Sequence, residues 1–243
     1  MSKNLFTLLI AFIMCLASCS LVSKDFDTSD KDNLIIQLIT YVLDQAHYLD
    51  KEINDEFSEK VFDTFLENLD PYKRYFYASD IEEFSKYKYL IDDAFKNPNL
   101  DFFELVYKRY TKRMLESEKI FNDILSKPFD FNKDEVCECD FEELDYVKTK
   151  DQLFDRWRKL LKIYVIEIYH NEIEDDLRKS KENSDFILRK PVLIEQKTRE
   201  SLKEIMQQNY VFISEEMQRS DWFSVYINSF VSQYDPNTSY LDP

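Results

Sequence analysis

The sequence of 243 residues contains no glycine, has a formal net charge of −16, and is 44% hydrophobic and 33% charged. The missing glycine excludes Gly-rich phosphate-binding loops, dinucleotide fingerprints and Gly-x-Ser-x-Gly nucleophile elbows, and it disfavours a β fold, because tight hairpins depend on glycine. The acidic balance argues against nucleic-acid binding, which requires a basic face, and the apolar content is ample for a buried core.

The first residues resemble a secretory signal peptide that ends at a lipidation site. Lys3 precedes the mostly apolar run Leu5–Leu16, which is too short to span a membrane well. Leu16-Ala17-Ser18-Cys19 resembles the bacterial lipobox, whose cysteine is diacylated and becomes the new N-terminus. We therefore predict a signal peptide over 1–18, lipid attachment at Cys19 and an acidic tether over 19–32. The alternative is an ordinary cleaved signal that happens to contain cysteine.

Helical periodicity then recurs along the chain and predicts an irregular all-α fold of about seven helices, with minor strand at most. Asp70-Pro71 ends one helix, because the residue before proline avoids the helical region. Ser79 with Glu82, and Thr149 with Gln152, have the spacing of capping boxes and mark helix starts. The expected helices are Asn33–Leu49, Ser58–Asn68, Ser79–Phe95, Asp101–Ser126, Asp151–Glu182, Pro191–Gln208 and Asp221–Gln233.

Residues 127–149 interrupt this helical pattern with an irregular, acidic segment. We expect it to admit a short strand and to mark a weak subdivision of a helical domain over 33–234. Cys137 and Cys139 lie in it as a Cys-x-Cys pair, which is a poor zinc site because zinc takes four ligands. Three interpretations of the pair remain open: the two cysteines form a small disulfide, they pair with another molecule, or they are loop thiols without a role. We favour the last.

No arrangement typical of catalysis stands out in the sequence. His47 and His170 each lack a second histidine at metal-ligand spacing, and acidic runs such as Glu174-Asp175-Asp176 are typical of solvated helix faces. Arg156-Trp157-Arg158 is interpreted as a core tryptophan whose basic neighbours pair with acids, in preference to an anion site. We therefore predict no catalytic residue, no metal site and no cofactor.

Three stretches together resemble the N-terminal domain of the tail-specific, or C-terminal-processing, proteases of bacteria. They are HYLDKEINDEFSEKVFDTFLENLDPYKRYFYASDIEEF at 47–84, RWRKLLK at 156–162 and YDPNTSYLDP at 234–243. Asn237 departs from the histidine that the family usually has there. The residues that match the family pattern, all expected to be structural, are Asp70, Pro71, Ser79, Asp80, Arg156, Trp157, Arg158, Asp235, Pro236 and Thr238.

In that family the Tyr-Asp-Pro turn leads into a PDZ domain and then a serine protease domain with a Ser–Lys dyad. The resemblance implies that residues 235–243 begin a linker into these domains and that this chain, which lacks them, is a non-catalytic N-terminal part. Full-length relatives process periplasmic and envelope proteins from apolar C-termini. The alternatives are a free-standing helical lipoprotein that binds partners and, less favoured, an enzyme with an unrecognised site.

The partners expected from this interpretation are the membrane, through the lipid anchor, the PDZ and protease domains in a full-length form, and protein substrates, but no nucleic acid. The expected location is the periplasmic side of the bacterial envelope. Ser20 follows the lipidated cysteine without an aspartate retention signal, which favours the outer membrane. A Gly-rich, PDZ-like stretch encoded directly downstream would favour the protease-part interpretation over the free-standing lipoprotein.

Overall fold

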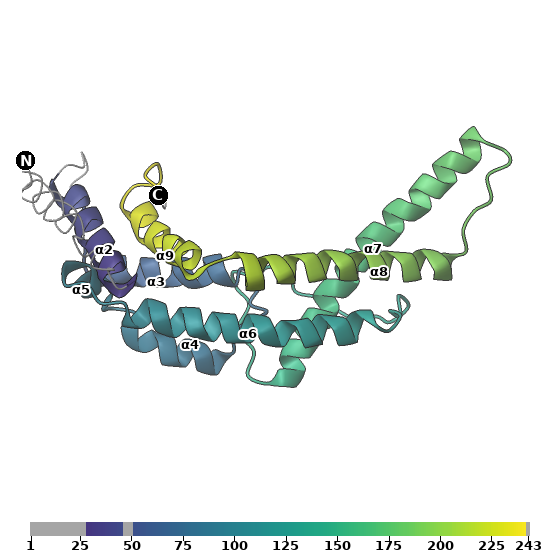
Figure 1. Ribbon diagram of the computed structural model, residues 1–243. Coiled ribbons are helices and arrows are strands. Elements are labelled where there is room, and N and C mark those ends of the chain that lie inside the picture. Colours follow the sequence, from purple (N-terminus) through teal and green to yellow (C-terminus); the bar gives the residue numbers. More distant parts are fainter. Residues whose placement is uncertain (1–27, 46–50, 242–243) are drawn as a thin grey trace, which may run out of the picture.

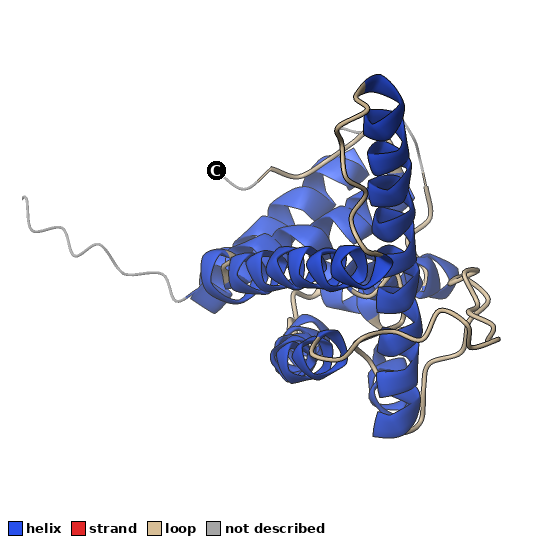
Figure 2. Ribbon diagram, turned by 90° about the vertical axis from the view of Figure 1, so that its right-hand side faces the viewer, coloured by secondary structure: helices blue, strands red, loops and turns tan. Residues whose placement is uncertain are grey.

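The computed structural model describes residues 28–45 and 51–241, in which helices are joined by loops and no strand forms (Figure 1, Figure 2). The eight α-helices of this part are α2 (Thr28–Gln45), α3 (Asp55–Leu69), α4 (Ala78–Phe84), α5 (Ile91–Lys96), α6 (Asp101–Leu125), α7 (Lys150–Glu182), α8 (Pro191–Val211) and α9 (Arg219–Tyr234). A 3₁₀ turn over Ser85–Tyr87 follows α4, and a π-helical turn over Phe212–Glu216 extends α8. The all-α prediction is confirmed.

The long helices begin and end close to the predicted residues. The capping box at Thr149 is confirmed: its hydroxyl accepts the Gln152 amide at 3.3 Å, and the Gln152 side chain accepts the Thr149 amide at 3.2 Å. Pro191 is the first residue of α8, where its missing N–H costs nothing. The first helix differs, since α2 begins at Thr28, inside the predicted tether. Expectations for the signal peptide, Cys19 and His47 fall outside the described residues.

The single helix expected over Ser79–Phe95 is wrong, because α4, a 3₁₀ turn and α5 replace it. Ser79 is exposed in the first turn of α4, and the Tyr77 amide donates to the Asp80 carboxylate at 3.0 Å, so the cap lies two residues earlier than predicted. The Ser58 hydroxyl of α3 accepts the Asp92 amide at 2.8 Å and so fixes the start of α5. A contact with another helix therefore determines where the predicted single helix is interrupted.

Aromatic side chains of several helices meet in the core. Phe65 of α3, Phe103 of α6 and Tyr226 of α9 are each at most 1% exposed, and the Tyr226 ring centroid lies 5.0 Å from that of Phe65 and 5.6 Å from that of Phe103. Offset and edge-on pairs of this kind add to the stabilisation from area burial. One core cluster of buried residues runs from Ile36 to Tyr234 through both halves of the chain.

The helices form an elongated molecule in which α6 and α8 run side by side (Figure 1). Helices α2, α3, α5 and α9 gather at one end, and α3 packs against both α5 and α9. Helix α7 packs on α6 and α8 with its first half, and its second half projects from the body as a hairpin with the start of α8 (Figure 1).

The segment 127–149, which connects α6 to α7, does not form the expected short strand. Its only ladder contact among the described residues is an isolated parallel bridge between Val147 and Tyr77, with the Ala78 amide donating to the Val147 carbonyl at 2.8 Å. The bridge brings the end of the segment beside the turn between α3 and α4. Most of the residues that match the family pattern lie around this turn.

Candidate functional site

A buried carboxylate organises the turn that follows α3. Asp70 is 1% exposed, and its two oxygens accept the backbone amides of Arg74 at 2.7 Å and of Tyr75 and Phe76 at 2.9 Å each. Burial raises the pKa of Asp70, and the three amides together with the Arg74 charge act in the opposite direction. Lys73, inside the turn, has a φ of 45°, a left-handed geometry that glycine would adopt without steric cost.

Two successive residues of α7 hold the outside of this turn. Arg156 donates to the carbonyl of Lys73 at 2.6 Å, and the Trp157 indole N–H donates to the carbonyl of Arg74 at 2.7 Å. The second Arg156 amino group donates to the Asp145 carbonyl at 2.7 Å. The expectation that Arg156 pairs with an acid is therefore wrong, because its acceptors are carbonyls. We call Asp70, Arg156 and Trp157, together with the turn whose backbone they bind, the turn clamp.

Trp157 itself is a core residue, as predicted. Its side chain is 0% exposed, and its ring centroid lies 5.8 Å from that of Tyr75 in an edge-on contact. The Arg74 guanidinium lies over the indole at 4.7 Å from the centroid. An aromatic face stabilises a cation at this distance, so Trp157 contributes apolar burial, a hydrogen bond and a cation–π contact at one position.

The basic neighbour on the other side of Trp157 does pair with acids. Arg158 donates to both oxygens of Glu135, at 3.0 and 2.5 Å, and to Asp155 at 2.8 Å, while Lys162 donates to Glu135 at 2.7 Å. These cations, Arg158 first, hold the pKa of Glu135 well below its usual range. Glu135 belongs to the segment 127–149, so the cluster ties this segment to α7.

Asp80 is the centre of a second buried ion cluster, at the start of α4. It is 0% exposed and accepts two hydrogen bonds from Arg113 at 2.9 Å each, and a third from Arg109. Burial acts to raise the pKa of Asp80, but the bonds from Arg113, the Tyr77 amide and Arg109 outweigh it, and the pKa lies below its usual value. The cluster joins α4 to α6.

The last group of family-pattern residues lies apart from the turn clamp, after α9. Asp235 is 5% exposed, and its oxygens accept the Asn237 amide at 3.0 Å and the Thr238 hydroxyl at 3.1 Å. The turn predicted at Asp235-Pro236 is confirmed, with Pro236 exposed. Asn237 is also exposed, and its amide side chain donates to Asp235 at 3.3 Å.

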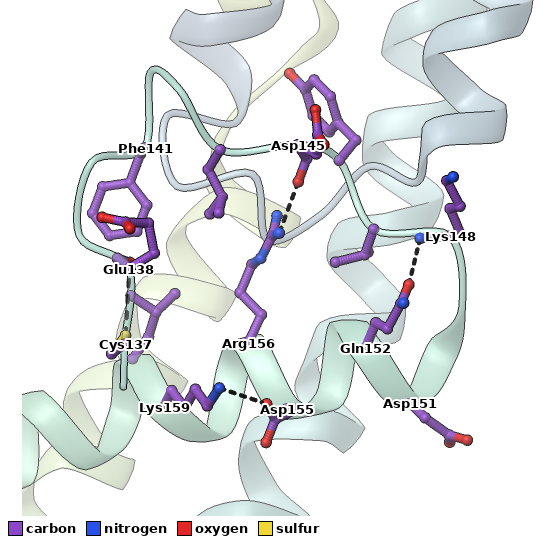
Figure 3. Close-up of a pocket in the computed structure, with 14 residues that line it drawn as sticks. Cys137, Glu138, Phe141, Asp145, Lys148, Asp151, Gln152, Asp155, Arg156 and Lys159 are labelled. Carbon is purple, nitrogen blue, oxygen red and sulfur yellow. Dashed lines mark hydrogen bonds and ion pairs between the residues drawn. The ribbon is translucent and has the colours of Figure 1, made fainter. Parts of the chain in front are cut away.

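A surface pocket of about 610 Å³ lies against the turn clamp, between α7 and the segment 127–149 (Figure 3). Its lining contains four acids and three bases, and the Arg156 guanidinium points across it to the Asp145 carbonyl (Figure 3). Burial raises the pKa of the Cys137 thiol, which disfavours the nucleophilic thiolate form. Cys137 and Cys139 are free thiols.

Other candidate ligands are scattered. Among the residues that the structure describes, no group of three or more His, Cys, Asp or Glu side chains is placed to hold a metal ion. His170 is exposed on α7, 3.3 Å from Glu174. None of the helices in the described part of the chain has the length and apolar character needed to cross a membrane.

Sequence reasoning identified Asp70, Trp157 and Asp235 but missed the groups they depend on. No local sequence pattern marks Glu135 or the carbonyls of Lys73 and Arg74, because their partners lie far away in the sequence. Asn54 was also missed as the cap of α3, where its side chain accepts the Phe57 amide at 3.1 Å. The pattern Asn-Asp-Glu before an apolar stripe is a recognisable helix start.

Comparison with known proteins gives one consistent result. The family described as "Tail specific protease N-terminal domain" matches residues 39–243. A curated relative, the tail-specific protease of Haemophilus influenzae, is 27% identical over 216 residues, which is 88% of this chain. The chain spans 28% of the length of that relative. All the residues of the turn clamp lie within the matched range.

Replacing Trp157 by alanine is expected to lower the free energy of unfolding by about 3–5 kcal/mol, because it removes a fully buried indole. Trp157→Phe keeps most of the apolar contact but leaves the Arg74 carbonyl without its donor, so a smaller loss of about 1–3 kcal/mol is expected. Urea denaturation followed by circular dichroism measures both. A Trp157→Ala variant as stable as the parent would show that the clamp does not hold the fold.

The Glu135 cluster predicts a specific pH dependence. A carboxyl whose pKa is depressed in the folded state stabilises it above the unfolded pKa of about 4.3, and this contribution is lost as the pH falls through the folded value. The stability difference between the parent and Glu135→Gln should therefore be constant from about pH 7 to 5 and shrink below about pH 4.3. Glu143→Gln, exposed in the same segment, is the matched control; identical pH profiles for the two variants would contradict the prediction.

Proposed function

The chain belongs to the tail-specific protease N-terminal domain family, and from this membership we propose that it is the non-catalytic helical framework of an envelope protease. The observation that carries the proposal is the turn clamp. Asp70, Arg156 and Trp157 match the family pattern, and their hydrogen-bonding groups engage the backbone of the chain itself. Residues of this kind maintain a shape and offer no group to a reacting substrate.

The chemistry of serine peptidases supports this division of roles. A serine nucleophile needs a base within hydrogen-bond reach and donors for the developing oxyanion. Arg156 and the Trp157 N–H are donors, but their acceptors are main-chain carbonyls, two in the turn that Asp70 holds and one at Asp145 in the segment 127–149. We therefore assign the reaction, processing of proteins from apolar C-termini, to the further domains of a full-length protease, and shaping of access to them to this domain.

Lipid attachment at Cys19 is the second part of the proposal. The Leu-Ala-Ser-Cys sequence follows an apolar run, and α2 begins nine residues after the cysteine. Diacylation provides the two hydrophobic chains that stable anchoring requires. The domain would then face the periplasm, with the outer membrane as the favoured location.

A second candidate function, partner binding by a free-standing lipoprotein, is favoured by one observation. The projecting α7–α8 hairpin carries exposed apolar residues, with Ile187 88% and Val192 67% exposed. Single exposed apolar side chains are ordinary, but several together on a projection are typical of contact surfaces. This function needs no further domain, whereas the framework role does.

The purified chain is expected to leave proteins uncleaved. The test is incubation with an unfolded substrate that ends in apolar residues, with products identified by mass spectrometry. The same substrate with a polar C-terminus is the control for contaminating proteases. Cleavage that is lost on substituting a single serine or lysine of this chain would overturn the non-catalytic assignment.

Replacing Cys19 by alanine is expected to release the protein from the membrane fraction into the soluble periplasmic fraction. The parent should carry a diacylated Cys19 as its first residue, which mass spectrometry of the mature N-terminus detects. Cys139→Ala, which alters an exposed thiol within the domain, is the matched control and should stay with the membrane. An unmodified mature N-terminus at another residue would contradict lipid attachment.

A further inference from the structure

The outer face of α2 is apolar and exposed. Leu34, Leu38, Tyr41 and Val42 are 46, 55, 65 and 51% exposed. Their spacing of four, three and one residues places them on one side of the helix, because residues three and four apart are neighbours on its surface. We call these four residues the α2 outer stripe.

The opposite face of the same helix packs on the core. Ile36 and Leu43 are 0 and 2% exposed, and Ile35 and Ile39 pack against the core cluster. The run 33–43 contains no charged residue, although 33% of the chain is charged. Exposed apolar residues that gather on one helix face, opposite a face already buried in the core, are typical of a contact surface, so the outer stripe fits a second apolar surface.

The position of α2 in the chain indicates what that surface is. Thr28 comes nine positions after Cys19 in the sequence, and a chain of this length reaches at most roughly 32 Å when fully extended. Lipid chains attached to Cys19 would therefore hold α2 within this distance of a bilayer. We propose that the outer stripe of α2 lies in the interfacial region of the membrane to which Cys19 is attached; this step depends on the lipid attachment proposed above.

The composition of the stripe suits this environment. Tyrosine is enriched at membrane–water interfaces, where its ring is apolar and its hydroxyl remains hydrated, and leucine and valine enter the acyl boundary. Burying these four side chains removes no charge from water, so the acidic character of the chain does not oppose the contact directly. The contact would fix the orientation of the domain relative to the membrane.

The experiment supplies the tether artificially, so that it does not depend on acylation. The mature chain carries an N-terminal hexahistidine tag in place of Cys19 and binds vesicles of phosphatidylethanolamine, phosphatidylglycerol and a nickel-chelating lipid. Cys137 and Cys139 are replaced by serine, and Leu38→Cys carries an environment-sensitive fluorophore. Leu38 is already exposed, so the substitution is expected to be tolerated, and circular dichroism checks the fold.

The matched control is the same fluorophore at Ile187→Cys, on the hairpin at the opposite end of the molecule from α2 (Figure 1). On vesicles, the fluorophore at position 38 should shift to shorter wavelength, gain several-fold in intensity and be quenched by spin-labelled lipids. The fluorophore at position 187 should keep its aqueous spectrum.

Two results would overturn the proposal. The fluorophore at position 38 could remain aqueous on vesicles, or it could shift without vesicles in proportion to protein concentration, which would show that a second copy of the chain covers the stripe. Neither result touches lipid attachment, which the fractionation of Cys19→Ala tests separately. Conversely, if the parent protein appears in the soluble fraction, lipid attachment at Cys19 is contradicted, but the vesicle measurement still tests whether the outer stripe enters a bilayer.

Discussion

The fold depends on how one buried carboxylate is satisfied. Asp70 lies at 1% exposure, where an unpaired charge would be costly, and three backbone amides of the following residues surround it. Those amides are available only because the chain reverses sharply through Lys73. The reversal turns the carbonyls of Lys73 and Arg74 outward, and Arg156 and Trp157 donate hydrogen bonds to them. The end of α3, the start of α4 and the middle of the molecule are fixed together.

The absence of glycine explains why side chains stabilise so many of the helix ends and turns. Helix ends and sharp turns commonly use glycine, which adopts left-handed geometry freely. Here Asn54 caps α3, Asp80 caps α4, Asp70 holds the turn between them, and Asp235 holds the turn after α9. Short polar side chains that bind nearby amides are the physical substitute, and some of the chain's many acids serve this purpose.

Local sequence signals predicted the parts of the fold that local energetics determine. The Thr149 box and the long apolar stripes gave α6, α7 and α8 with small errors at their ends. The prediction failed over Ser79–Phe95 because a contact from Ser58 of another helix starts α5, and no pattern within the segment records that contact. At the candidate site, the burial of Trp157 and the turns at Asp70 and Asp235 were predictable from residue type. The acceptors of Arg156 were not, because a main-chain carbonyl has no sequence signature.

Helix α7 connects the turn clamp to the projecting hairpin, and this gives the clamp a consequence at a distance. Its contacts with the clamp and the Glu135 cluster come from Arg156 to Lys162, and about 20 further residues continue to Glu182, a length of roughly 30 Å at the usual helical rise. Near its far end, Asp176 of α7 accepts hydrogen bonds at 2.9 and 2.6 Å from Arg189, which ties the loop that precedes α8 to α7. A rotation of about 10° at the clamp would therefore displace the hairpin end by roughly 5 Å. The direction of the hairpin therefore depends on how the first half of α7 is held against the body, to which the hydrogen bonds of Arg156 and Trp157 contribute together with the packing of α7 on α6 and α8.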